Sequence, residues 1–137
     1  MESKYIIFQF NKEDRNIYAI NIENVEFIAN NNEAIFTNYE ISKNKPGLVT
    51  IRTRTMPYYE NKEFSNIRSS NQKVALIVKK DDKKIALFMN EVLSLENVKE
   101  FVGNDFSIDS VNKEYIIDFF RDKKGNMVSV LNPDLFF

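Results

Sequence analysis

Apolar and polar positions alternate with a period of two along most of the chain, and the apolar runs are short and rich in β-branched and aromatic residues. Such patterning predicts strands rather than helices. The first two runs, 5–10 (YIIFQF) and 17–22 (IYAINI), flank a polar turn and predict a hairpin. The same plan returns at 74–78 (VALIV) and 85–89 (IALFM), which flank the turn KKDDKK.

The C-terminal part predicts a third hairpin, in which 115–120 (YIIDFF) pairs with 127–131 (MVSVL). Gly125 and Asn126 lie between these runs and supply the positive-φ positions that a tight turn needs. Further on, NPDLFF predicts a helical turn that begins with a proline in its first position.

Between the first two hairpins, 48–59 (LVTIRTRTMPYY) alternates throughout and predicts one long strand with two distinct faces. Arg52 and Arg54 would lie on the same face of this strand. Pro57 cannot donate to a strand ladder, so we expect a bend or a sheet edge there. A short helix followed by a loop is expected in 61–70. The whole chain is then expected to hold nine or ten strands and two short helices.

A weak internal repeat follows the first two hairpins. Each hairpin is succeeded by a short acidic or amide element and a valine, in INIENVEFI and in FMNEVLSL, and the two valines, Val25 and Val92, are 67 residues apart. A repeat at a fixed offset indicates a duplicated structural module, although a simple meander of hairpins can produce the same short pattern. We expect an all-β domain made of two similar units.

Composition narrows the classes of function. The 137 residues suit one domain. The absence of cysteine excludes disulfides and thiolate chemistry, and the absence of histidine removes the usual general base and zinc ligand. The formal net charge of -1 provides no strong field for a polyanion. The longest apolar runs fall far short of the roughly 20 residues that span a bilayer, and no signal peptide precedes the first strand. We expect a cytoplasmic protein.

An enzyme would have to use carboxylates, and the candidates are Asp81 with Asp82, or Asp105 with Asp109. Solvated turns explain both pairs more simply. The sequence contains no glycine-rich phosphate loop, zinc spacing or calcium loop, so no metal or cofactor is expected.

A small β-barrel that binds nucleic acid is the other alternative, since such barrels hold single strands through basic grooves and stacking aromatic rings. One cluster has this character, formed by Arg52, Arg54, Tyr58 and Tyr59.

The order of these elements resembles the CheW-like family of bacterial chemotaxis coupling proteins, over essentially the whole chain. The family's run of asparagine, leucine, arginine and glycine, followed by a proline and an aspartate, corresponds here to 50–53 (TIRT), Pro57 and Glu60. The arginine and the proline are therefore kept. A glycine-leucine-valine-valine-aspartate run corresponds to 86–90 (ALFMN), and Phe27 stands where members usually carry a glutamate.

The resemblance implies an all-β fold of two five-stranded, SH3-like β-barrel subdomains, related by pseudo-duplication around a shared hydrophobic core, with one or two short helices. We expect 1–137 to form this single domain. The first barrel would comprise mainly 12–70 and the second mainly 71–137, with strand 5–10 able to join the second.

The resemblance also implies a non-catalytic adaptor without a cofactor. Members bridge the cytoplasmic tip of a membrane chemoreceptor and the regulatory domain of a chemotaxis histidine kinase. We therefore expect recruitment to membrane-associated receptor arrays, where copies can self-associate. Core packing is the alternative role for Val25 and Ile28, and a structural salt bridge for Arg52. No residue is assigned to the kinase surface. The residues implied in receptor binding are Val25, Phe27, Ile28, Arg52, Lys73 and Val74.

Overall fold

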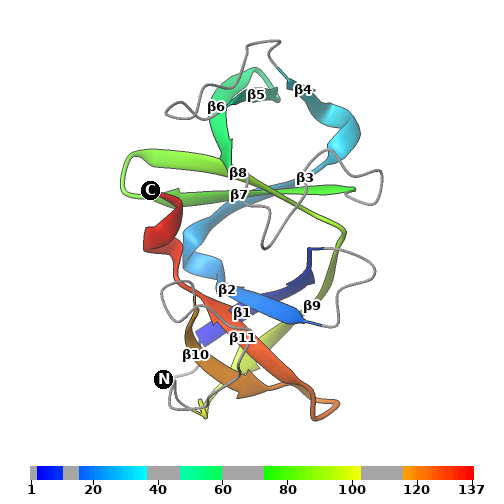
Figure 1. Ribbon diagram of the computed structural model, residues 1–137, viewed down its shortest axis with the longest axis vertical. Helices are drawn as coiled ribbons and strands as arrows, with labels where there is room; N and C mark the ends of the chain where they lie inside the picture. The colour runs from blue at the N-terminus through cyan, green and yellow to red at the C-terminus, as the bar shows by residue number, and fades with distance from the viewer. Residues whose placement is uncertain (1–2, 11–15, 37–46, 60–72, 103–115) are drawn as a thin grey trace.

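The computed structural model describes residues 3–10, 16–36, 47–59, 73–102 and 116–137. The described chain consists almost entirely of strands, which confirms the all-β prediction, and Figure 1 shows them arranged as two curled sheets. The elements are, in order, β1 (Ser3–Gln9), β2 (Ile17–Asn21), η1 (Ile22–Asn24), β3 (Val25–Asn30), η2 (Asn31–Glu33), β4 (Ala34–Phe36), β5 (Leu48–Ile51), β6 (Arg54–Tyr59), β7 (Val74–Lys80), β8 (Lys83–Met89), β9 (Glu91–Val98), β10 (Ile116–Arg121), β11 (Met127–Leu131) and η3 (Pro133–Phe136), where η marks a 3-10 helix.

All three predicted hairpins are present. The pairs β1–β2, β7–β8 and β10–β11 are antiparallel, with the central residues of each run facing one another across the ladder. Gly125 takes a φ of 85° in the last turn, as its position predicts, and the carboxylate of Asp122 accepts hydrogen bonds from the backbone amides of Lys124 and Asn126 at 2.9 and 2.8 Å. Local alternation and turn chemistry are sufficient to define these hairpins.

The two sheets repeat one plan. The first sheet has the order β10-β11-β2-β1-β9, and the second has the order β3-β7-β8-β6-β5-β4. In each, a central hairpin is flanked by a parallel strand on one side, β11 or β6, and by an antiparallel strand on the other, β9 or β3. The second sheet adds β4. This shared order confirms the internal duplication.

The strand that follows each of the hairpins β1–β2 and β7–β8 in sequence pairs with a strand of the other sheet. β3 follows β2 in sequence but pairs with β7, and β9 follows β8 but pairs with β1. Each sheet therefore takes strands from both sides of residue 70. Both exchanged strands also contain a one-residue irregularity next to the repeated valine, at Glu26 in β3 and at Leu93 in β9. The repeat thus extends to this bulge, which bends the strand locally.

The prediction of one long strand over 48–59 is wrong. β5 and β6 form an antiparallel hairpin whose two-residue turn consists of Arg52 and Thr53, with φ angles of 52° and 67°. The turn contains no glycine or asparagine. The alternation of apolar and polar residues continues across it, so the sequence pattern does not mark it as a turn. At Pro57 the pairing of β6 changes from β5 to β8. The helix expected in 61–70 lies outside the described residues.

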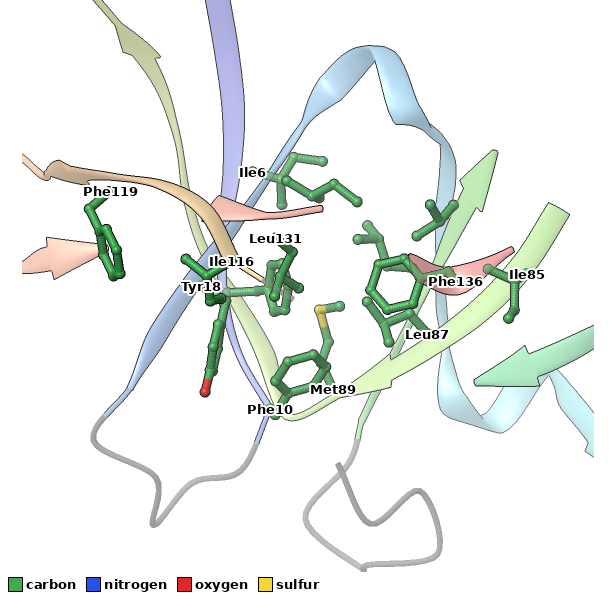
Figure 2. Close-up of a cluster of buried hydrophobic side chains, with 14 residues drawn as sticks. Ile6, Phe10, Tyr18, Ile85, Leu87, Met89, Ile116, Phe119, Leu131 and Phe136 are labelled. Atoms are coloured by element: carbon green, nitrogen blue, oxygen red, sulfur yellow. The ribbon is translucent and has the colours of Figure 1, made fainter. Parts of the chain in front are cut away.

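A core shared by both sheets holds the molecule together, and we call it the central core. The repeated hairpins contribute opposite strand faces to different clusters: Leu76 and Leu87 point into the central core, whereas Ile77 and Phe88 fill a separate core inside the second sheet. The helical turn η3 begins with Pro133 in its first position, as predicted, and Asn132 is its N-cap residue. Figure 2 shows the central core, which contains Ile6, Phe8, Phe10, Tyr18, Ile20, Leu76, Val78, Ile85, Leu87, Met89, Ile116, Phe119, Leu131 and Phe136.

Candidate functional site

β3 forms an edge of the second sheet next to the central core. Because Glu26 is the extra residue of the bulge, Val25 lies opposite Val78 and Phe27 lies opposite Ile77. Val25 therefore packs against the central core and Phe27 against the core of the second sheet, both only partly buried. Ile28 leaves 41% of its surface exposed. An edge strand with exposed apolar surface is available to a partner.

Arg52 reaches β3 from the β5–β6 turn. Its Nε donates to Oε1 of Glu33 at 3.1 Å, and its Nη2 donates to Oε2 of Glu33 at 3.4 Å and to the carbonyl oxygen of Ile28 at 3.5 Å. The guanidinium carbon lies 5.0 Å from the centroid of the Phe27 ring, within cation–π range. The turn, η2 and β3 thus converge on one arginine, whose side chain remains 50% exposed.

Lys73 and Val74 adjoin the C-terminal end of β3. Val74 lies opposite Asn30 and packs partly buried against the central core. Lys73 is exposed, and its carbonyl oxygen accepts a hydrogen bond from the amide of Asn31 at 2.8 Å. Among the six residues implied by the resemblance, the structure brings Phe27, Ile28 and Arg52 into direct contact. Val25, Lys73 and Val74 lie at the two ends of the same strand pair.

Glu33 was missed in the sequence reasoning. Its Oε2 accepts a hydrogen bond from the amide of Asn30 at 2.9 Å, as the third-position glutamate of a capping box does. The hydrogen bond from Arg52, followed by that from the Asn30 amide, lowers the pKa of Glu33. The spacing of Asn30 and Glu33 was a signal that could have marked this helical turn.

Glu26 is the centre of a second, separate cluster of two ion pairs. Its Oε1 accepts hydrogen bonds from Nη1 of Arg54 at 2.8 Å and from Nζ of Lys84 at 2.9 Å. The hydrogen bond from Lys84 is the main cause of the lowered pKa of Glu26, and burial opposes it. Arg52 and Arg54 therefore do not share the face of one strand. Each ties the β5–β6 hairpin to β3, which is not its neighbour in the hydrogen-bonded order.

β9 is the corresponding edge strand of the first sheet. The sequence patterns did not identify it as a candidate surface. Val92 lies opposite Phe8 and packs against the central core, and Leu95 lies opposite Ile6 and is 52% exposed. Leu95 is 67 residues after Ile28. The repeat offset could have identified it. Ile28 and Leu95 each lie opposite a strand residue of the central core, so both lie at the margin of that core.

Among the described residues, the alternative sites do not assemble, and the side chain of Tyr59 lies outside the described part of the structure. Tyr58 is 4% exposed inside the second sheet's core, so its ring is not available to stack on a base. Asp81 and Asp82 are exposed in the β7–β8 turn, whereas Asp105 and Asp109 lie outside the described residues. Within the ranges that the structure describes, no cluster of three or more acidic residues could hold a metal. No helix in these ranges has the length and apolarity to cross a membrane.

The comparisons with known proteins agree with this architecture. Among solved structures, the scaffolding protein TtCheW from Thermoanaerobacter tengcongensis superposes with a TM-score of 0.70 at 14% identity, covering 96% of this chain and 85% of that one. At that identity the likeness shows the fold alone. No curated protein matches the sequence. The family model for the CheW-like domain matches residues 4–137. The match spans nearly the whole chain, and the protein therefore belongs to the CheW-like family.

Proposed function

We propose that this protein couples the cytoplasmic tip of a chemoreceptor to the regulatory domain of a chemotaxis histidine kinase. Membership of the CheW-like family makes the chain a non-catalytic scaffold of chemotaxis. A scaffold of this kind needs two docking surfaces rather than one reactive pocket. A transient signalling interface can be modest, on the order of 800 Å² per partner, with a few residues providing most of the affinity.

The receptor surface that we propose runs along β3. The observation that carries it is the contact of Arg52 with Phe27 and with the backbone of Ile28, which sets a cation beside exposed apolar surface on an edge strand. Arginine and aromatic residues are common among residues that dominate binding energy. Val25 and Val74 would extend this surface toward the central core.

We extend the proposed receptor surface to Leu95, with Lys73 as a charged residue immediately before β7. Ile28 is exposed on β3, and Leu93 and Leu95 are exposed on β9. The cross-strand partners of Ile28 and Leu95, which are Leu76 and Ile6, both belong to the central core. A receptor helix lying along the junction between the sheets could therefore contact both strands.

The kinase must then bind elsewhere. Large apolar side chains are exposed on other parts of the described surface: Ile35 and Phe36 lie on β4, and Ile117 lies on β10. Exposed apolar patches of this kind mark interaction sites in soluble proteins. Binding to a receptor would recruit the chain to membrane-associated arrays, where contacts between copies would be a further consequence.

The test is the substitution Arg52→Ala, with binding to a receptor-tip fragment and to the kinase regulatory domain measured by calorimetry. We expect the affinity for the receptor fragment to fall by about 2 kcal/mol, roughly thirtyfold, and the affinity for the kinase domain to stay the same. Arg121→Ala is the matched control, because Arg121 is an exposed arginine of the first sheet whose Nη1 bonds only the turn carbonyl of Gly125 among the described residues.

A folded Arg52→Ala protein that binds the receptor fragment as tightly as the wild type would overturn the proposed receptor surface. Failure of the wild-type protein to bind either partner would overturn the coupling function itself.

A further inference from the structure

We infer that Glu33 is a positioning residue that holds the guanidinium of Arg52 in the orientation that meets the receptor. The inference deepens the proposed function and rests on it. Arginine has a long side chain with many rotamers, so a free arginine loses conformational entropy when it binds. A side chain that is already held loses less, and its contact then contributes more to affinity.

Three groups restrict the guanidinium of Arg52. The two carboxylate oxygens of Glu33 face its Nε and Nη2 in a two-point contact, at 3.1 and 3.4 Å. Such fork-like pairing fixes the plane of the guanidinium as well as its position. The ring of Phe27 lies 5.0 Å away, and the carbonyl oxygen of Ile28 accepts a further hydrogen bond from Nη2. Glu33 supplies the charged member of this set.

Glu33 is itself anchored to the backbone. The amide of Asn30 donates to its Oε2 at 2.9 Å, across the first turn of η2. The order of support therefore runs from the β3–η2 junction, through the carboxylate, to the arginine. The backbone of Arg52 lies in the left-handed region, with a φ of 52°. This conformation is unfavourable for a residue other than glycine and persists only where surrounding contacts support it.

The remaining donor group points to the chemistry of the partner. Within the described part of the chain, Nη1 of Arg52 makes no hydrogen bond, while the side chain stays 50% exposed. Exposed apolar surface of Ile28 lies beside it. The geometry therefore suits a receptor carboxylate next to an apolar side chain, since a charge-assisted hydrogen bond to a held guanidinium is directional.

The experiment is a double-mutant cycle that combines Glu33→Gln with Arg52→Ala, read out as affinity for a cytoplasmic-tip fragment of a chemoreceptor from the organism that encodes this protein. Glutamine keeps an oxygen for the Asn30 amide but loses the charge that holds Arg52. We expect Glu33→Gln alone to weaken binding about three- to tenfold, the range expected when one rotamer-rich side chain is freed. In the Arg52→Ala background, the same substitution should change nothing, because Glu33 acts only through Arg52.

Asp134→Asn is the matched control, since it removes the carboxylate of another exposed ion pair, Lys80–Asp134, which joins β7 to η3 and involves neither Glu33 nor Arg52. It should leave receptor affinity unchanged. Urea unfolding of each variant separates binding from stability. A normal loss for Arg52→Ala with no loss for Glu33→Gln would overturn the inference and leave the proposed function standing. An equal loss from Glu33→Gln in both backgrounds would also overturn it. If Arg52→Ala binds like the wild type, the receptor surface fails together with the inference.

Discussion

At the scale of single residues, Arg52 joins an aromatic ring and a carboxylate in the proposed receptor surface. The ring of Phe27, on β3, lies beneath its guanidinium. The carboxylate that pairs with it belongs to Glu33, on the 3-10 turn that follows β3. The arginine therefore has an ionic partner although the strand position beneath it is apolar.

A second carboxylate, Glu26, makes folding stability depend on pH. The hydrogen bond from Lys84 and the contact with Arg54 lower its pKa below the ordinary 4.5 in the folded chain. The ionised form is therefore favoured by folding, so its contribution is complete above pH 4.5 and is lost as the pH falls through the lowered pKa. We expect Glu26→Gln to reduce the free energy of unfolding by about 1 kcal/mol or less at pH 7, since its partners are partly exposed.

The measurement is the urea midpoint of wild type and Glu26→Gln between pH 7 and about 3. The gap between the two proteins should close as the solution becomes acidic. Glu91→Gln, at an exposed position of β9, should shift the midpoint little at either pH. A gap that stays constant or widens in acid would show that the charge of Glu26 does not stabilise the fold.

At the scale of elements, the β5–β6 hairpin is the least expected part of the fold. Its two turn residues, Arg52 and Thr53, both have positive φ angles, the pattern of a type I′ turn. Side chains with a β carbon disfavour this region, and a β-branched threonine disfavours it most. The turn persists because both flanking strands are paired and because Arg52 is tied to β3.

We predict that Thr53→Gly stabilises the protein by about 1 kcal/mol, because glycine adopts positive φ at no steric cost. The free energy of unfolding in urea provides the measurement. Thr55→Gly, two residues later in β6, is the matched contrast and should destabilise, since the strand loses a residue of good β-propensity. The prediction is wrong if both glycine substitutions destabilise equally.

At the scale of the whole molecule, the central core joins the two sheets into one unit. The hairpins β1–β2 and β7–β8 both contribute to it, and so do β10, β11 and η3. The exchange of β3 and β9 adds covalent and hydrogen-bonded links between the sheets. Neither sheet can lose its packing without uncovering apolar surface of the other, so cooperative unfolding is expected.

Leu87→Ala tests this coupling. Leu87 is fully buried in the central core, and its truncation should cost about 2–5 kcal/mol of unfolding free energy. Circular dichroism, which reports on both sheets, and tyrosine fluorescence should show one coincident transition at lower urea concentration. Leu95→Ala, at a position 52% exposed, should cost far less. Two separated transitions in the Leu87→Ala protein would contradict a shared core.

The three hairpins could be predicted because each depends on contacts that are close in sequence, and the duplication could be predicted because a short pattern recurs 67 residues later. The alternation of 5–10 and 17–22, with a polar turn between them, is enough to define β1 and β2. The direct contact of Arg52 with Phe27 could not be predicted, because it depends on a turn without a glycine signal and on a strand that pairs outside its own hairpin. The contact between Arg52 and Phe27 forms only once β3 has paired with β7, which is distant in sequence.

An all-β, duplicated chain of the CheW-like type follows from the order of amino acids alone, because strand period and turn chemistry act over a few residues and the order of elements carries the family likeness. The sheet that each of β3 and β9 joins, and the carboxylate that each of Arg52 and Arg54 binds, are known only from the three-dimensional structure. Those outcomes depend on packing two hairpins against one core, where the best burial of all apolar faces selects among pairings that the local patterns leave equivalent.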